Sequence, residues 1–314
     1  MNYRRGMRSF ILFKWSNDFS KARNYSFSKA SQDYILWLDG DDVILKTDRA
    51  ALLELKNSIN PDVDVVKMNY NVNFDELDYI TGSYYTERLV KRSKNFKWLA
   101  PVHEYLSVNG KVININISIT HEKNEIDHAR NLKIYEYMKS HDDSFSTRST
   151  YYYALELYFN KNYEHAIASF KEFLNTTKGS IENNISACLA LSQCYSFKKD
   201  RKNELKYLLE TLTYDIPRAE TCCELGYFYK NNSGYYNAAF WFETALSLKK
   251  DENYFGYIRH DCFDYIPCVE LSLCYFQLGA VNEAIKYNNW AGQYKPGDKI
   301  VAHNNEFLKK YNKE

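Results

Sequence analysis

The stretch Tyr34-Ile-Leu-Trp-Leu-Asp39-Gly-Asp41-Asp42 decides how the first part of this 314-residue chain folds. Five apolar residues are followed by three carboxylates within four positions. A short apolar run with a glycine close behind it is typical of a buried strand that ends in a turn. Because ligand sites of open α/β sheets lie at the carboxyl ends of the strands, this acidic turn is a candidate site.

Three carboxylates this close together repel one another unless a cation lies between them. Hard divalent ions such as Mg²⁺ and Mn²⁺ prefer oxygen ligands and often bind substrate phosphates at the same time. The turn is therefore a candidate metal site. The alternative is an acidic turn that caps the following helix. For Asp42 we expect either that cap or a supporting position beside the metal ligands.

The segments around the turn predict an α/β unit. A helix is expected from Phe19 to Ala30, capped by Asp18, because apolar residues recur there at three- and four-residue spacing. Thr47 to Ser58 is a second amphipathic helix, and Val63 to Met68 is a second strand. This strand–turn–helix–strand order predicts a parallel sheet.

A further strand is expected from Lys111 to His121, where apolar and polar residues alternate strictly. It ends on a histidine, and imidazole is a common ligand of transition metals. His121 is thus a candidate metal ligand, or alternatively a strand-end histidine that is hydrogen-bonded to the backbone. A helix follows from Ala129 to Ser140.

The overall composition argues against several classes of protein. The 41 basic and 40 acidic residues are balanced, so neither nucleic-acid nor membrane-surface binding is expected. No apolar run approaches the ~20 residues of a membrane span, and the apolar stretch near the N-terminus is too short for a secretory signal. The seven cysteines contain no CxxC pair, which indicates a reduced, cytoplasmic protein.

From residue 150 onward the sequence repeats itself. Three segments share a buried-type alanine with a small residue twelve positions earlier, and a degenerate fourth copy lies between the first two. The pairs are Ala154 and Ala166, Ser192 and Leu208 (the degenerate copy), Gly226 and Ala238, and Ser272 and Ala284. The small residues are 38, 34 and 46 positions apart, close to the ~34-residue tetratricopeptide period. The sequence therefore predicts four helix pairs, each with a small residue that lets its two helices approach closely.

An insert, Asn253 to Pro267, separates the third and fourth copies. It contains Arg259-His-Asp-Cys262, which has the residue types of a catalytic set, but we expect an ordered loop between repeats. The histidines outside the candidate site form no ligand-like cluster: His128, His141, His165, His260 and His303.

The first half of the chain resembles family 2 glycosyltransferases of the GT-A fold. The resemblance rests on five motifs in order: Asp18-Phe-Ser-Lys-Ala-Arg23-Asn24, Ile35-Leu-Trp-Leu-Asp39-Gly-Asp41, Arg88-Leu-Val, Trp98 with Val102-His103-Glu104, and His121. Together with the repeats they are similar to bacterial proteins that include peptide-modifying S-glycosyltransferases. The implied fold class is α/β plus all-α: a partial, Rossmann-like GT-A domain at 1–140 and a tetratricopeptide helical solenoid at 150–314.

Such domains normally open with a βαβ unit that holds the nucleotide base. In this sequence the helix before the acidic strand is reached by residue 18. We therefore expect a GT-A domain that lacks its first βαβ unit.

The resemblance implies a metal and donor site. Asp39 and Asp41 would form the DxD pair that holds Mn²⁺ or Mg²⁺ against the donor diphosphate, with His121 as a further ligand. Donor binding would involve Arg23, Asn24, Asp39 and Arg88. The alternative for the two arginines is an ion pair with a local carboxylate.

The resemblance also implies an acceptor side. Glu104 would be the general base that deprotonates the acceptor, with His103 beside it. The alternatives are an orienting or salt-bridging role for Glu104 and a packing role for His103. Trp98 offers a flat face to a sugar or acceptor, although a core tryptophan is the alternative.

The predicted function is metal-dependent transfer of a sugar from a nucleotide-sugar, a UDP-sugar, to a peptide, protein or glycan acceptor. Stacked helix pairs form concave surfaces, so the solenoid is expected to hold part of the acceptor or a partner protein. The rival prediction is an inactive glycosyltransferase remnant that serves as a tetratricopeptide adaptor.

Overall fold

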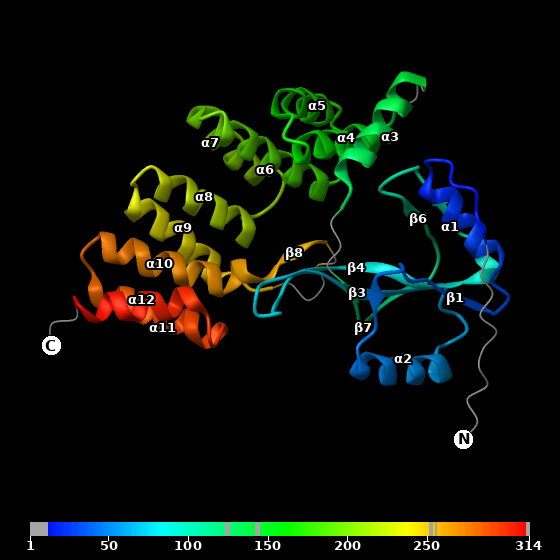
Figure 1. Cartoon of the computed structure of the whole chain (residues 1–314), viewed down its shortest axis with the longest axis horizontal. Helices are drawn as coiled ribbons and strands as arrows, with labels where there is room; N and C mark the ends of the chain where they lie inside the picture. Colours follow the sequence, from blue (N-terminus) through cyan, green and yellow to red (C-terminus); the bar gives the residue numbers. More distant parts are fainter. Residues whose placement is uncertain (1–11, 123–125, 142–144, 251–253, 255, 312–314) are drawn as a thin grey trace. The chain divides into compact units, whose positions relative to one another are not determined.

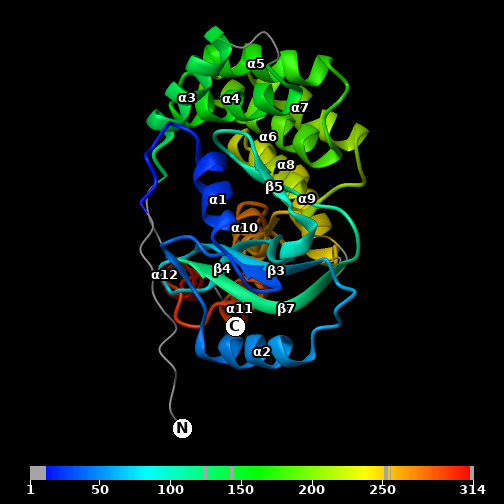
Figure 2. The same cartoon turned by 90° about the vertical axis from the view of Figure 1, so that its right-hand side faces the viewer.

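The computed structural model describes residues 12–122, 126–141, 145–250, 254 and 256–311 (Figures 1 and 2). The chain forms two compact units, one of residues 1–70 and 85–143 and one of residues 71–84 and 144–314. The first unit is an α/β structure and the second is mainly helical, which confirms the predicted fold class. Within the described residues, no helix combines the length and apolar character needed to cross a membrane. The cytoplasmic location stays a prediction.

The α/β structure contains both predicted N-terminal helices and more strands than the sequence indicated. Its helices are α1 (Phe19–Ser28), α2 (Lys46–Ser58), α3 (His128–His141) and the 3₁₀ turn η1 (Arg92–Lys94). Its strands are β1 (Tyr34–Leu36), β2 (Asp42–Val43), β3 (Val65–Phe74), β4 (Ile80–Lys91), β5 (Lys97–Leu99), β6 (Tyr105–Ser107) and β7 (Val112–His121).

The main sheet has the strand order β1-β4-β3-β7-β2. The predicted parallel pairing is wrong, because β4 lies between β1 and β3 and pairs antiparallel with β1. The prediction that β1 is buried is also wrong: at the end of the strand order, its Leu36 is 37% exposed. Strand β3 continues past the predicted end at Met68 to Phe74, and a short turn joins it to β4.

One side chain caps helix α1 and another fixes it to strand β5. Asp18 accepts a hydrogen bond from the Lys21 N–H, as predicted for an N-cap. The Asn24 amide bonds both the N–H and the C=O of Trp98 on β5, at 3.0 and 2.9 Å. Helix α1 and the β5–β6 ribbon lie on one face of the sheet, and α2 lies on the other, against β7 (Figures 1 and 2).

The helical region consists of four helix pairs and a final helix. The helices are α4 (Thr147–Phe159), α5 (Tyr163–Asn175), α6 (Ile181–Phe197), α7 (Arg201–Glu210), α8 (Ala219–Asn231), α9 (Tyr235–Ser247), α10 (Tyr265–Gln277), α11 (Val281–Tyr294) and α12 (Lys299–Lys309). Short elements between them are η2 (Thr211–Thr213), β8 (Ile258–Arg259) and η3 (His260–Phe263). All eight residues on which the repeat prediction rests are buried, so the predicted pairing is confirmed.

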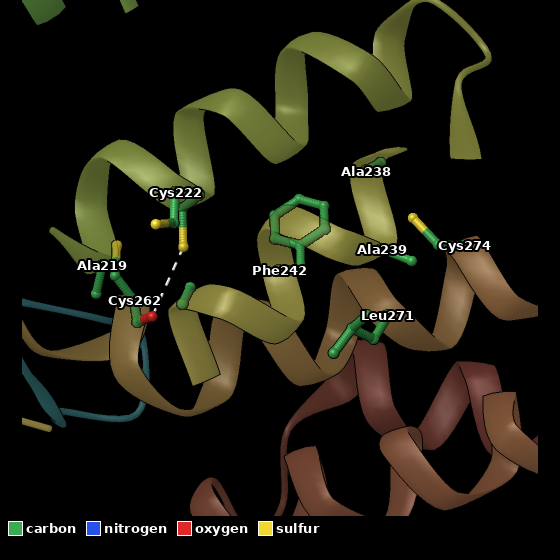
Figure 3. Packing of buried hydrophobic residues seen from close by; sticks show 10 residues of the cluster. Ala219, Cys222, Ala238, Ala239, Phe242, Cys262, Leu271 and Cys274 are labelled. Carbon is green, nitrogen blue, oxygen red and sulfur yellow. Dashed lines mark hydrogen bonds between the residues drawn. The ribbon is translucent and has the colours of Figure 1, made fainter. Parts of the chain in front are cut away.

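The core of the later repeats is built from small and aromatic residues. Figure 3 shows Phe242 lying among Ala238, Ala239, Leu271 and Cys274, all of them buried. The seven cysteines are free and buried. Burial raises the pKa of Cys222 and Cys274 to about 12, chiefly by desolvation, which is typical of inert packing residues.

Gly226 shows why the repeat needs a small residue on its first helix. A Cβ atom at this position would lie 2.6 Å from the ring of Phe242. Because Phe242 is fully buried, its ring has little room to move away. The side chain that limits the approach of α8 and α9 is therefore Phe242.

Overpacking usually costs about 1–3 kcal/mol, and alanine gains roughly 1 kcal/mol over glycine in a helix. We therefore expect Gly226→Ala to lower the free energy of unfolding by up to about 2 kcal/mol. Urea denaturation followed by circular dichroism measures the change. The double variant Gly226→Ala/Phe242→Leu should be less destabilised than the sum of the two single variants. A Gly226→Ala protein as stable as the wild type would contradict the close packing.

Candidate active site

Asp42 is the residue of the acidic turn that is held by the most hydrogen bonds described here. The two-residue strand β2 pairs antiparallel with the end of β7, which places Asp42 opposite His121. The Asp42 carboxylate is fully buried: Oδ2 accepts hydrogen bonds from Arg88 Nη1 at 2.8 Å and from the Asp39 N–H at 2.9 Å. Its Oδ1 accepts the Tyr70 hydroxyl at 2.7 Å. The predicted helix cap is wrong, since α2 begins after Leu45 without a side-chain cap. The contacts of Asp42 are compatible with the other expectation, a supporting position beside the metal ligands.

Arg88 balances the charge of Asp42 inside the protein. It is 0% exposed, and its guanidinium carbon lies 4.0 Å from the ring centroid of Trp37 and 4.1 Å from that of Tyr70. Aromatic faces on both sides compensate part of the lost hydration of this cation. With no exposed surface to offer a phosphate, Arg88 fits the alternative reading, an ion pair with a local carboxylate.

Asp41, Asp42 and His121 form a group with the composition of a metal site. One ligand atom from each lies within 4.8 Å of the others. His121 Nδ1 is 3.7 Å from Asp41 Oδ1 and 3.5 Å from Asp42 Oδ1. Asp41 and His121, two of the three predicted ligands, are thus brought together beside Asp42, whereas the third, Asp39, is paired with Arg23.

Tyr70 fixes which nitrogen of His121 is available to a ligand. Its hydroxyl lies 2.7 Å from Asp42 Oδ1 and 3.0 Å from His121 Nδ1. An ionised carboxylate only accepts, so the single Tyr70 proton is donated to Asp42. In the neutral imidazole, Nδ1–H then donates to the Tyr70 oxygen and Nε2 keeps its lone pair. Such a bond to the second ring nitrogen is usual in metal-binding histidines.

Sequence reasoning missed Tyr70. The alternation of buried residues along β3, in which Met68 and Tyr70 share a face, was the one available signal. This alternation indicates that Tyr70 is buried, but it does not indicate which residues Tyr70 contacts.

Arg23 joins two other predicted site residues. Its Nη2 lies 2.7 Å from Asp39 Oδ1 and its Nε 2.5 Å from Glu104 Oε1. The guanidinium also lies over the rings of Trp37 and Trp98, at 4.8 and 4.7 Å. Burial alone lowers the pKa of Arg23, but the two carboxylates outweigh this effect and raise it. Asp39 and Glu104 therefore share one permanent cation.

The remaining predicted residues have packing contacts. Trp98 is buried between Phe27 and Trp37, with ring centroids at 5.8 and 4.8 Å, which favours the core alternative. His103 has a left-handed backbone conformation, with φ at 49°, and its ring stacks on Tyr135 at 6.1 Å. The amide of Asn24 is bound to the backbone of Trp98.

A cavity of about 720 Å³ lies between the start of α1 and one side of α3. Its walls include Asp18 and Lys21 from the start of α1, Pro101, and Arg130, Lys133 and Tyr137 from α3. Pro101 belongs to the same loop as Glu104, three positions earlier. The walls of this cavity do not include the Asp41–Asp42–His121 group.

Comparison with protein families identifies both regions. Residues 5–117 match the model of glycosyl transferase family 2, and residues 219–252, which contain α8 and α9, match a tetratricopeptide repeat. The chain therefore contains a family 2 glycosyltransferase domain and a tetratricopeptide region, as the motifs predicted. No curated protein sequence matches the chain significantly.

Solved structures similar to this chain include a tetratricopeptide repeat protein and MamA. A tetratricopeptide repeat protein from Parabacteroides merdae ATCC 43184 matches with a TM-score of 0.46 and 12% identity, over 59% of this chain and 66% of its own. MamA matches with a TM-score of 0.42 and 17% identity, over 59% of this chain and 92% of its own. The chain thus spans just under two thirds of the first of these relatives.

We expect Arg88→Met to lower the free energy of unfolding by about 3–5 kcal/mol, because it leaves the buried Asp42 carboxylate without its cation. Urea denaturation measures the loss. Arg92→Met is the matched control: this neighbouring arginine is exposed and donates one hydrogen bond to the backbone of Gln32, so its loss should cost at most about 1 kcal/mol.

The double variant Arg88→Met/Asp42→Leu should recover much of the stability, since it removes both buried charges. Equal stability of Arg88→Met and Arg92→Met would contradict the buried ion pair.

Proposed function

We propose that this chain, with its family 2 glycosyltransferase domain and tetratricopeptide region, transfers a sugar from a nucleotide-sugar to an acceptor with the help of a divalent cation. The single observation that supports this best is the group of Asp41, Asp42 and His121. The donor we propose is a UDP-sugar, and the acceptor is a peptide, protein or glycan.

The donor set fits a divalent transition metal. The Asp41 carboxylate and the His121 imidazole, with the Asp42 carboxylate beside them, suit Mn²⁺ better than Mg²⁺, which prefers oxygen ligands alone. Asp41 and a ring nitrogen of His121 would hold the ion, and Asp42 would support them. When bound, such an ion neutralises the charge that develops on a leaving diphosphate. In this proposal Tyr70 would hold His121 and Asp42 in place, and Arg88 would hold Asp42.

Arg23 would serve the donor and the base at once. Its guanidinium has five N–H donors, and the bonds to Asp39 and Glu104 use two of its nitrogens. A donor phosphate would bind beside these carboxylates or take the place of Asp39. Glu104, held by Arg23 Nε, would accept the proton of the acceptor nucleophile.

The acceptor would bind away from Trp98, because that ring is buried. The loop that carries Glu104 also carries Pro101, a wall of the 720 Å³ cavity. We place the acceptor side chain in this cavity because its wall residue Pro101 is only three positions before the proposed base, Glu104. The concave surfaces of the helix pairs would bind the rest of an extended acceptor or a partner protein.

One observation favours the rival function, an inactive remnant acting as an adaptor. Both Asp39 and Glu104 are already paired with Arg23 in the structure. If this pairing persists in the presence of donor, neither carboxylate is available for chemistry. Binding of the donor nucleotide separates the two functions.

We expect UDP to bind the purified chain in calorimetric titrations with Mn²⁺ present, and at least about tenfold more weakly without it. Asp41→Asn should remove most of this metal dependence, because the amide is a poorer ligand than the carboxylate. Asp62→Asn, which changes an exposed carboxylate outside the site, is the control and should bind like the wild type. Metal-independent binding, or equal binding by Asp41→Asn, would contradict the metal site.

A graded version of the same titration uses Tyr70→Phe. Loss of the hydroxyl removes a hydrogen bond to Asp42 and one to His121, and such outer contacts typically change metal affinity 10–100-fold. Absence of UDP binding under all conditions would favour the adaptor.

A further inference from the structure

The end of the β3–β4 hairpin belongs to the helical unit. Residues 71–84 form one compact unit with residues 144–314, while the remaining parts of both strands belong to the first unit. An isolated two-stranded hairpin is marginally stable in water, so this end needs partners of its own. The insert between the third and fourth helix pairs supplies them.

The insert adds a strand to the hairpin. Strand β8 pairs antiparallel with β4, with Arg259 opposite Gly82 and Ile258 opposite Ser83. Strand β1 pairs with residues 89–91 of β4, and β8 pairs with residues 82–83 of the same strand. This is strand addition to a sheet edge, a common mode of peptide recognition, here within one chain.

Side chains reinforce this pairing on both sides. A Cβ atom at Gly82 would lie 2.4 Å from the hydroxyl of Tyr257, so the tyrosine ring packs directly against this glycine. The Ser83 hydroxyl is 2.8 Å from His260 Nε2. Arg259 in turn is bound to α8: its N–H donates to Glu220 and its Nη1 to Glu224, at 2.9 and 2.8 Å. The insert is therefore fixed to the repeats and to the hairpin.

Lys295 is the centre of this junction. It directly follows α11, is 5% exposed, and its ammonium lies 2.6 Å from Asp75 Oδ2 in the hairpin turn and 2.6 Å from Asp261 Oδ2 in the insert. The other oxygen of Asp75 accepts the N–H groups of Leu77 and Tyr79, both at 2.9 Å, and so shapes the turn. One buried cation thus joins three segments of the chain.

The charges at the junction are consistent with a permanent ion pair. Burial alone lowers the pKa of Lys295, but Asp261 and Asp75 outweigh it and raise the pKa. Burial would raise the pKa of Asp75, but Lys295 and the two turn N–H groups lower it. Both partners therefore keep their charges near neutral pH. A buried cation with two carboxylates is costly to disrupt from one side.

The same two strands carry the residues that hold Asp42. Tyr70 lies on β3, directly before the hairpin end at 71–84, and Arg88 lies on β4, four positions after it. We propose that Lys295 and insert residues 256–264 act as a clamp on the hairpin end, which positions Tyr70 and Arg88 and thereby the metal ligands. In this proposal Lys295 is a positioning residue. The effect on metal binding rests on the proposed function; the clamp itself does not.

The test is Lys295→Met in the full chain, with amide hydrogen exchange and Mn²⁺ titration as readouts. We expect the amides of residues 71–84 to exchange at least about tenfold faster, and the Kd for Mn²⁺ to rise about tenfold or more, the usual range for a lost supporting contact. The matched control is Lys299→Met. The side chain of Lys299 is 88% exposed, and its ammonium forms a long, solvent-exposed pair with Glu76 at 3.7 Å. Because such a pair contributes little, both readouts should stay at wild-type values.

Ser83→Ala provides a milder variant in case Lys295→Met does not fold, because it removes only the hydrogen bond to His260. Unchanged exchange of residues 71–84 in both variants would overturn the clamp. Faster exchange with unchanged Mn²⁺ affinity would overturn the positioning effect and leave the metal site intact. A wild type that binds no Mn²⁺ would overturn the metal site and the positioning effect, while the exchange rates would still decide whether the clamp exists.

Discussion

The buried ion pair of Asp42 and Arg88 is the interaction on which the candidate site depends. A carboxylate without exposed surface costs several kcal/mol unless it is paired and hydrogen-bonded. Asp42 meets this requirement with bonds from three directions: Arg88 on β4, Tyr70 on β3 and the backbone N–H of Asp39. Since these partners lie on neighbouring strands, the position of the acidic turn follows from the order of the sheet. Asp41 is held next to His121 as a consequence.

The charges of the turn are distributed in a way that the motif alone does not reveal. Asp42 is balanced by Arg88, and Asp39 by Arg23, which it shares with Glu104. Repulsion among three carboxylates therefore does not by itself require a metal ion, because two guanidinium groups already reduce it. The proposed metal is supported instead by the close approach of Asp41 to His121, whose Nδ1 lies 3.7 Å from Asp41 Oδ1.

Elements with a strong local pattern could be predicted from the sequence. The Asp18 cap predicted α1, the alternation of residues 111–121 predicted β7, and the small residues such as Gly226 predicted the helix pairs. Strand β4 could not be predicted, because its apolar and polar residues do not alternate clearly and its place between β1 and β3 is set by distant pairing. The roles of Tyr70 and Arg88 depend on a partner 28 and 46 positions away. No local pattern contains that information.

The insert illustrates the same limit, because its contacts with the hairpin end connect segments that are far apart in the sequence. Its residues read as a loop between repeats, yet His260 bonds Ser83 across 177 positions of sequence. A cut between residues 143 and 144 would leave the hairpin end on one fragment and Lys295 on the other. The buried ammonium would then keep only Asp261 of its two carboxylates, and β8 would lose its partner strand. The helical unit therefore includes residues 71–84, and an adaptor made of the repeats alone would lack part of its own structure.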